Sequence, residues 1–203
     1  AWMAEGQAAG AGTSLTSPFT PNSNPRLELT TAPGKISVDG VLDDAGWQGA
    51  ARAGNFTEFN PREGKQPTVK SEVWVTYDRD HLYLAFVAED DPSTIRASLA
   101  DRDRVWQDDY FGILLDTYGD ASWAYFLFAN PRGVQLDTRF SSTAGEDESF
   151  DIIYHSEAKI TENGYIIEMA IPFSSLRFPA SEEQTWRVNF WRTRPRASRE
   201  QHA

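Results

Sequence analysis

RVWQDDYFGILLDTY, residues 104–118, joins a polar loop to a strongly apolar segment. Within it, Tyr110 to Leu115 carries no charge, which predicts a buried β-strand. Trp106 and the adjacent carboxylates Asp108 and Asp109 precede this strand, and Asp116 follows it. A loop tryptophan beside acids at the mouth of a rigid strand suits a sugar site, a metal site or a packing role. The rest of the chain has to decide between them.

The segments on both sides carry the same β signal. Thr68 to Tyr77 alternates between apolar and polar residues, as a strand with one buried face does. Leu82 to Ala88 is apolar on both faces, which predicts a central strand covered on both sides. Further strands are expected at residues 26–30, 35–38, 56–59, 122–129, 134–140, 152–160, 165–171 and 186–193, with short helical turns at 41–47, 93–99 and 172–176. About ten short strands without a long amphipathic helix predict an all-β fold, an antiparallel β-sandwich.

Three regions of the chain differ in composition. Residues 1–25 are rich in Ala, Gly, Ser, Thr and Pro and lack periodicity, so we expect a disordered tail or linker. Residues 26–193 contain the predicted strands and are expected to form one sandwich domain. Residues 194–203 are basic and unpatterned, which indicates a linker toward a missing C-terminal region of a larger protein.

Bulk composition narrows the classes of ligand. The 203 residues carry a formal net charge of −11 and no cysteine. Nucleic-acid binding needs a basic surface that neutralises phosphates, so we expect no nucleic-acid partner. Anionic membrane surfaces are disfavoured for the same reason. The lack of cysteine excludes disulfides and thiolate metal sites. Neutral ligands and cations remain.

Motifs distributed over residues 33–193 carry a family resemblance. They are VDGVLDD (38–44) with Trp47, the hairpin 73–90 around DHLYL (80–84), WQDD (106–109) leading to Asp116, and the segment 164–172. In this order they resemble the family 9 carbohydrate-binding modules. NPREG (60–64), NPRGVQ (130–135) and SSLRF (174–178) are similar to one subgroup. That subgroup forms the N-terminal domain of bacterial proteins that end in a large outer-membrane-type β-barrel of unknown function.

The resemblance implies a β-sandwich of the carbohydrate-binding-module or DOMON-like type. Some members hold a sugar end between two tryptophans and carry structural calcium, and Trp106 falls at the position of one of these tryptophans. The sequence also departs from the family. Binders place a carboxylate where this chain has Gly112, and an arginine on the following strand, where this chain reads FLF (126–128). Their second tryptophan lies beyond the last strand, in a region that this chain lacks or has replaced by residues 194–199.

Candidate sugar contacts gather around Trp106. A sugar ring has an apolar C–H face that packs on an indole, while its hydroxyls bond to carboxylates and amides. Gln107 and Asp109 supply such groups beside Trp106. Asn130 in the NPRG turn and Trp191 on the partly polar last strand complete the predicted site. The alternative is that the indole packs over the end of the sandwich and the aspartates are simply solvated.

The acids also suggest a metal site. Calcium takes about six to eight oxygen ligands, often from carboxylates clustered in loops. Asp108 and Asp116 are the predicted ligands, because they are expected to converge at one strand entrance. Calcium is therefore the cofactor expected if the domain holds one. A solvated acidic loop is the alternative.

Catalysis is not expected. The adjacent carboxylates of Asp108 and Asp109 are poorly placed to flank a glycosidic bond, which requires oxygens about 5–10 Å apart across a cleft. The histidines show no metal-pair spacing. Haem held by His155 and Met169, on neighbouring predicted strands, is a further alternative.

Two hypotheses of function follow. The first is a non-catalytic module of a larger secreted or outer-membrane protein, which binds an oligosaccharide or polysaccharide by aromatic stacking. The second is a structural or interaction domain that has lost sugar binding and docks on or caps a C-terminal outer-membrane β-barrel of the same chain. Both predict a bacterial domain in the periplasm, at the outer membrane or outside the cell.

Overall fold

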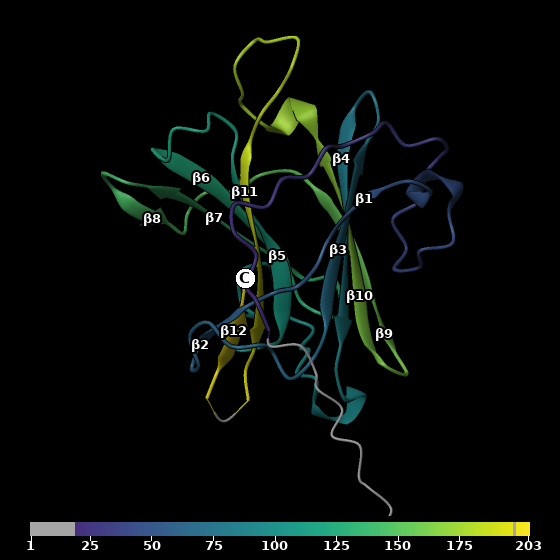
Figure 1. Cartoon of the computed structure of the whole chain (residues 1–203), viewed down its shortest axis with the longest axis vertical. Helices are drawn as coiled ribbons and strands as arrows, with labels where there is room; N and C mark the ends of the chain where they lie inside the picture. Colours follow the sequence, from purple (N-terminus) through teal and green to yellow (C-terminus); the bar gives the residue numbers. More distant parts are fainter. Residues whose placement is uncertain (1–18, 197) are drawn as a thin grey trace, which may run out of the picture.

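Two antiparallel sheets pack face to face (Figure 1). The structure is a computed structural model and describes residues 19–196 and 198–203. One sheet has five strands in the order β1 (Ala51–Ala53), β3 (Ser71–Tyr77), β4 (His81–Glu89), β10 (Gly164–Pro172) and β9 (His155–Thr161). The other has seven, in the order β2 (Glu58–Asn60), β12 (Glu200–His202), β11 (Arg187–Arg194), β5 (Tyr110–Asp116), β6 (Trp123–Ala129), β7 (Gln135–Ser141) and β8 (Gly145–Asp147).

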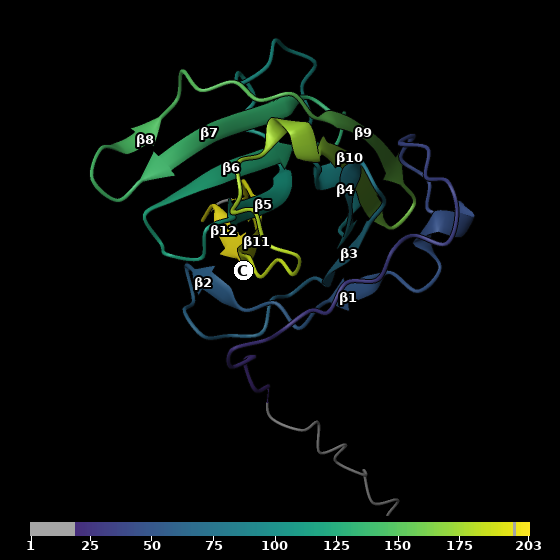
Figure 2. The same ribbon diagram turned by 90° about the horizontal axis from the view of Figure 1, so that it is seen from above.

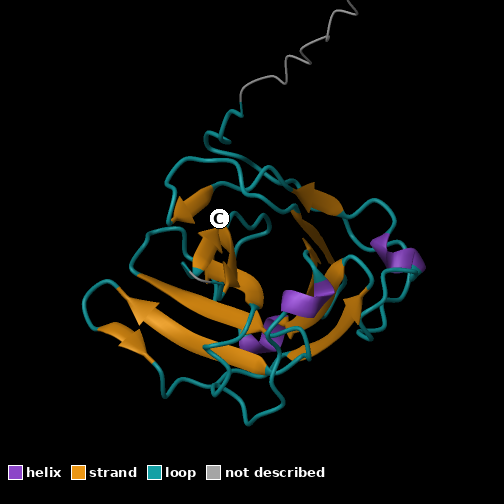
Figure 3. Ribbon diagram, turned by 90° about the horizontal axis from the view of Figure 1, so that it is seen from below, coloured by secondary structure: helices purple, strands orange, loops and turns teal. Residues whose placement is uncertain are grey.

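Helical structure in the described residues is limited to three short 3₁₀ turns (Figure 3). These turns are η1 (Ala45–Trp47), η2 (Pro92–Thr94) and η3 (Phe173–Ser175), each within or beside a predicted helical turn. The predicted antiparallel β-sandwich is therefore confirmed.

Strand β4 is the centre of the five-stranded sheet and is buried on both faces. Leu84 and Phe86 point into the core between the sheets, and neither is accessible to solvent. Ala85 points the other way and is equally buried. The N-terminal segment covers this outer face, where Ile36 and Trp47 pack in one cluster with Ala85 (Figure 2). Cover on both sides explains why the Leu82 to Ala88 segment is apolar throughout.

That covering segment differs from the prediction. Residues 26–30 and 35–38 do not form strands. The segment makes one isolated parallel bridge, between Thr31 and Tyr77, and crosses the sheet instead of extending it. Its alternating apolar residues pack down onto the sandwich, which produces a strand-like pattern without strand pairing. The expected tail at residues 1–25 falls mainly on residues 1–18, which lie outside the described residues.

The prediction that residues 194–203 form a linker is wrong. Strand β11 continues to Arg194, and β12 pairs with β11 on one side and with β2 on the other. The inward-facing side chains here are Arg192 and His202, both inaccessible to solvent. Because the strand ends are buried through ion pairs instead of apolar contacts, the usual alternation is absent. The sandwich therefore includes these residues.

Candidate functional site

The outer face of the seven-stranded sheet is lined with aromatic residues. Strand register places Trp191, Gly112 and Phe128 in one row across β11, β5 and β6. The next row along these strands contains Leu114 and Phe126. An outer sheet face is usually polar, so an apolar face of this kind indicates a contact surface.

Trp106 lies over this face from the loop before β5. Its ring centroid is 5.6 Å from that of Tyr110 and 6.3 Å from that of Phe128, with the rings edge to face. The indole is half-buried, and the adjacent Gln107 is exposed. Part of an apolar ring therefore remains open to solvent beside a free amide.

Trp191 belongs to the same face. It is half-buried, and its ring packs edge to face on Phe59, with centroids 4.6 Å apart. Its Nε1 donates to Thr193 Oγ1 at 3.1 Å, so the polar atom of the indole is already satisfied. Trp106 and Trp191 pack on one cluster that includes Tyr110 and Phe128. The structure thus brings Trp106 and Trp191 to one cluster, and the exposed Gln107 follows Trp106 in the chain.

Asn130 lies behind the face and is inaccessible to solvent. Its Nδ2 donates to the carbonyl of Ser98 at 2.8 Å and to Asp108 Oδ2 at 2.9 Å. Its Oδ1 accepts from the backbone N–H groups of Arg132 and Val134. Two donors and two lone pairs are all engaged, so this amide shapes the NPRG turn and has nothing left to offer a sugar.

Asp109 is also buried, contrary to the expected surface role. Its carboxylate accepts from Arg196 Nη1 at 2.9 Å and Nη2 at 3.2 Å, and from the Arg96 backbone N–H at 2.8 Å. This bidentate salt bridge between Arg196 and Asp109 fixes the C-terminal hairpin to the start of β5.

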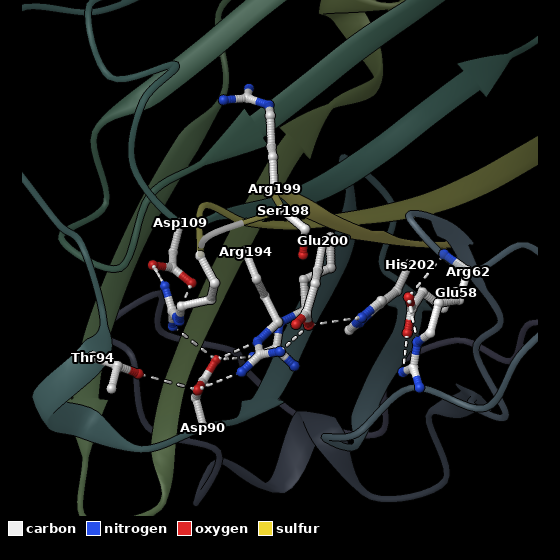
Figure 4. A network of polar contacts seen from close by, with 12 residues as sticks. Glu58, Arg62, Asp90, Thr94, Asp109, Arg194, Ser198, Arg199, Glu200 and His202 are labelled. Atoms are coloured by element: carbon white, nitrogen blue, oxygen red, sulfur yellow. Dashed lines mark hydrogen bonds and ion pairs between the residues drawn. The ribbon is translucent and has the colours of Figure 1, made fainter.

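The same hairpin is held by a second buried carboxylate, Asp90, at the end of β4 (Figure 4). Asp90 forms ion pairs with Arg192, Arg194 and Arg196 at 2.9, 2.7 and 3.1 Å. Burial opposes ionisation, but the hydrogen bond from Arg194 and the three positive charges outweigh it and lower the pKa of Asp90 to about 2. The carboxylate therefore stays charged and holds the three arginines in place.

The expected convergence of Asp108 and Asp116 is wrong. Asp108 precedes β5 and Asp116 ends it, so a strand of about 20 Å separates them. Asp108 accepts from the N–H and hydroxyl of Ser98 and from Asn130. Asp116 accepts from three backbone N–H groups, those of Tyr118, Gly119 and Ala121. Both carboxylates hold turns, and the pair does not fit a shared calcium site.

A different acidic cluster comes together beside β7. Carboxylate oxygens of Asp103, Asp137 and Asp151 lie within 4.8 Å of one another. The guanidinium of Arg102 forms ion pairs with all three. The arginine neutralises this cluster in the way a cation would, so the arrangement is explained as a salt-bridge network.

Gly112 has a steric cause. A Cβ at this position would lie 2.1 Å from the Leu127 carbonyl oxygen and 2.5 Å from Phe128 Cδ1, far inside contact distance. The Phe128 ring covers the place into which a side chain would project. No carboxylate side chain can therefore be accommodated here. The carboxylate that the family's binders have at this position is absent from this chain for steric reasons, and the face is apolar there.

Two residues of the face are missed by sequence reasoning. Phe59, from edge strand β2, reaches Trp191 only because the C-terminal strand pairs beside it. Arg199, in the β11–β12 hairpin, donates from Nη2 to the Trp106 carbonyl at 3.0 Å and to Tyr110 Oη at 3.4 Å. Both depend on the C-terminal strand that the linker prediction overlooked.

Two hollows lie away from this face. One, of about 300 Å³, is lined by residues such as Ile36, His81 and His155. The other, of about 990 Å³, is at an end of the sandwich and is lined by residues such as Phe56 and Asp90. Neither is lined by Trp106 or Trp191, so both hollows are separate from the aromatic face.

The family of the chain is shown by its sequence. Residues 38–190 match the family model described as "Carbohydrate family 9 binding domain-like". The match spans most of the chain, and the chain belongs to this family. The predicted family resemblance is confirmed at this level.

Solved structures agree on the fold. A family 9 carbohydrate-binding module from Caldicellulosiruptor kristjanssonii in complex with cellotriose is 17% identical, covers 86% of this chain and 81% of its own, and gives a TM-score of 0.54. The same source in complex with glucose is 18% identical, with coverages of 85% and 83% and a TM-score of 0.51. A putative carbohydrate-binding protein from Bacteroides uniformis is 13% identical, with coverages of 72% and 75% and a TM-score of 0.56.

No curated protein sequence matches this chain significantly. Among the described residues, no helix combines the length and apolar character needed to cross a membrane.

Proposed function

We propose that this domain is a non-catalytic carbohydrate-binding module that holds an oligosaccharide or polysaccharide on the outer face of its seven-stranded sheet. The observation that carries the proposal is the pair of half-buried indoles, Trp106 and Trp191, packed on one apolar cluster. An indole partly open to solvent offers the surface on which the C–H face of a sugar ring stacks. The exposed amide of Gln107 supplies a hydrogen-bonding group beside it.

The spread of aromatic residues across neighbouring strands of the face favours binding along a glycan chain. Aromatic rings spread over a face can stack on successive sugar rings without having to enclose a chain end. Membership of the family and the folds of the sugar-bound modules support this choice over other ligands for an aromatic surface.

The setting is part of the proposal. We infer that the domain belongs to a larger secreted or outer-membrane protein and acts in the periplasm, at the outer membrane or outside the cell. The subgroup signatures NPREG and NPRGVQ support this inference. Calcium stays a prediction without an assigned site, and a rise in melting temperature with calcium relative to a chelator would support it.

A second function is favoured by one observation on the same face. Phe126 and Phe140 stack with centroids 6.1 Å apart and an interplanar angle of 14°, and Phe140 is 39% exposed. Exposed apolar rings of this kind suit a protein partner. In this alternative the domain is an interaction module that docks on or caps an associated β-barrel.

Isothermal titration calorimetry against a panel of neutral and acidic oligosaccharides separates the two functions. Binding should weaken at least about tenfold in Trp106→Ala, because stacking of one ring contributes on the order of 1.4 kcal/mol or more. Trp74→Ala is the matched control, since Trp74 is a half-buried tryptophan of β3, in the other sheet. If no oligosaccharide gives heat, the glycan proposal fails and the docking function is favoured.

A further inference from the structure

Arg199 is placed at the edge of the aromatic face by the β11–β12 hairpin. The side chains of Arg194 and Arg196 turn to the buried carboxylates, whereas Arg199 extends away from that cluster (Figure 4). Its Nη2 is tethered to the Trp106 carbonyl at 3.0 Å and to Tyr110 Oη at 3.4 Å. The guanidinium is therefore held at the backbone of Trp106 and at the hydroxyl of Tyr110, the ring that packs edge to face on the Trp106 indole.

Most of the hydrogen-bonding capacity of Arg199 is unused. A guanidinium has five N–H donors, and in the described part of the chain only those of Nη2 have partners. No carboxylate of the described residues lies within ion-pair distance of it, although neighbouring Arg194 and Arg196 each have two. A half-buried cation without an anion, fixed in place by two bonds, presents its Nε and Nη1 donors to a ligand.

Around Trp106 the described residues of the face offer donors, and the exposed carboxylate of the face, that of Glu146, lies on the far edge strand β8. Asp108 and Asp109 are buried and hydrogen-bonded within the fold, and Gly112 excludes a carboxylate from the centre of the face. Neutral sugars present hydroxyls that donate as well as accept, so they are held best where carboxylates are available. A ligand carboxylate only accepts, and it matches the paired donors of an arginine.

We propose that Arg199 is a specificity-determining residue that makes this face select glycans carrying a carboxylate, of the uronic-acid type, over neutral ones. The inference rests on the proposed glycan-binding function. The overall charge of −11 argued for neutral ligands, but charges farther than about 8 Å are largely screened at physiological ionic strength, so the local cation decides.

The test compares two ligands that differ only in the carboxyl group. Calorimetry is run with a galacturonic acid trisaccharide and with its carboxyl-reduced counterpart, a galactose trisaccharide. The wild-type domain is expected to prefer the acidic ligand by on the order of tenfold, and added salt should reduce this preference. Arg199→Gln should bind the two ligands equally. Arg199→Lys should keep part of the preference, because it retains the charge without the paired donors.

Two controls keep the result interpretable. Arg187→Gln removes an exposed arginine from the same face of β11, at its opposite end, and should leave the preference unchanged. The preference is a ratio measured on one protein sample, so a loss of folded protein in Arg199→Gln does not alter it.

The outcomes distinguish the two levels of the proposal. If the wild type binds both ligands equally while Trp106→Ala weakens both, glycan binding stands and the role of Arg199 is overturned. A preference that survives in Arg199→Gln also overturns it. If neither trisaccharide nor any panel member binds, the glycan-binding function fails and this inference fails with it.

Discussion

Acid is expected to destabilise the domain through His202 in β12. This histidine is inaccessible to solvent, and its two ring nitrogens have no hydrogen-bond partner among the described residues. Burial, and then the positive charges of Arg192 and Arg194, lower the pKa of His202 from 6.5 to about 4. The folded state therefore holds a neutral imidazole where the unfolded chain readily takes up a proton.

The sign and size of the effect follow from this difference. Between the folded pKa of about 4 and the unfolded value of 6.5, the unfolded state binds more protons, so stability falls as the pH drops through that window. About pH 5 is about 1.5 pH units below the pKa of histidine in the unfolded chain. At 1.36 kcal/mol per unit, protonation of the unfolded chain therefore lowers the free energy of unfolding by about 2 kcal/mol.

Urea denaturation at about pH 7.5 and about pH 5 measures this loss. The control is His202→Gln, which keeps a polar side chain and removes the titration. The wild type should lose about 2 kcal/mol more than the variant over this interval, whatever the other groups contribute. Equal losses in the two proteins would refute the role assigned to His202.

Three substitutions test the packing, ion pairs and buried hydrogen bonds of the sandwich, each by urea denaturation. Gly112→Ala should cost more than about 3 kcal/mol, because its Cβ would meet the Leu127 carbonyl oxygen at 2.1 Å; a loss below about 1 kcal/mol would contradict this. Asp90→Asn should cost about 3–5 kcal/mol by leaving three arginines, two of them buried, without their shared anion, and near-neutral stability would argue against that network. Glu168→Ala removes the buried acceptor of the Trp47 indole and of two backbone N–H groups and should cost about 3 kcal/mol or more; an unchanged midpoint would speak against it.

The sheets were predictable because their periodicity reflects burial directly. The alternation in the β3 sequence predicts a strand with one buried and one more exposed face. The uninterrupted apolar run of β4 predicts a strand that is covered on both faces. The C-terminal strand was not predictable in this way. Arg192 of β11 and His202 of β12 are buried although they are polar or charged. The sequence gives the residue types but does not show which carboxylates they meet in the fold.

The candidate site was predictable in part. Trp106 and Trp191 do share one face. Asp109 and Asn130 were expected to contact a sugar because they are polar and near Trp106. Both are buried, and residue type alone does not show how deeply a polar side chain is buried. The separation of Asp108 from Asp116 was within reach, because a strand of this length spans about 20 Å and its ends cannot share an ion.

The measurement that tests the central claim most directly is titration of the wild type and Trp106→Ala with the oligosaccharide panel. We predict saturable binding of at least one glycan by the wild type and an affinity at least about tenfold lower in the variant. Trp74→Ala should bind as the wild type does. The absence of binding to every glycan, or equal affinity in wild type and Trp106→Ala, would contradict a carbohydrate-binding role for this face.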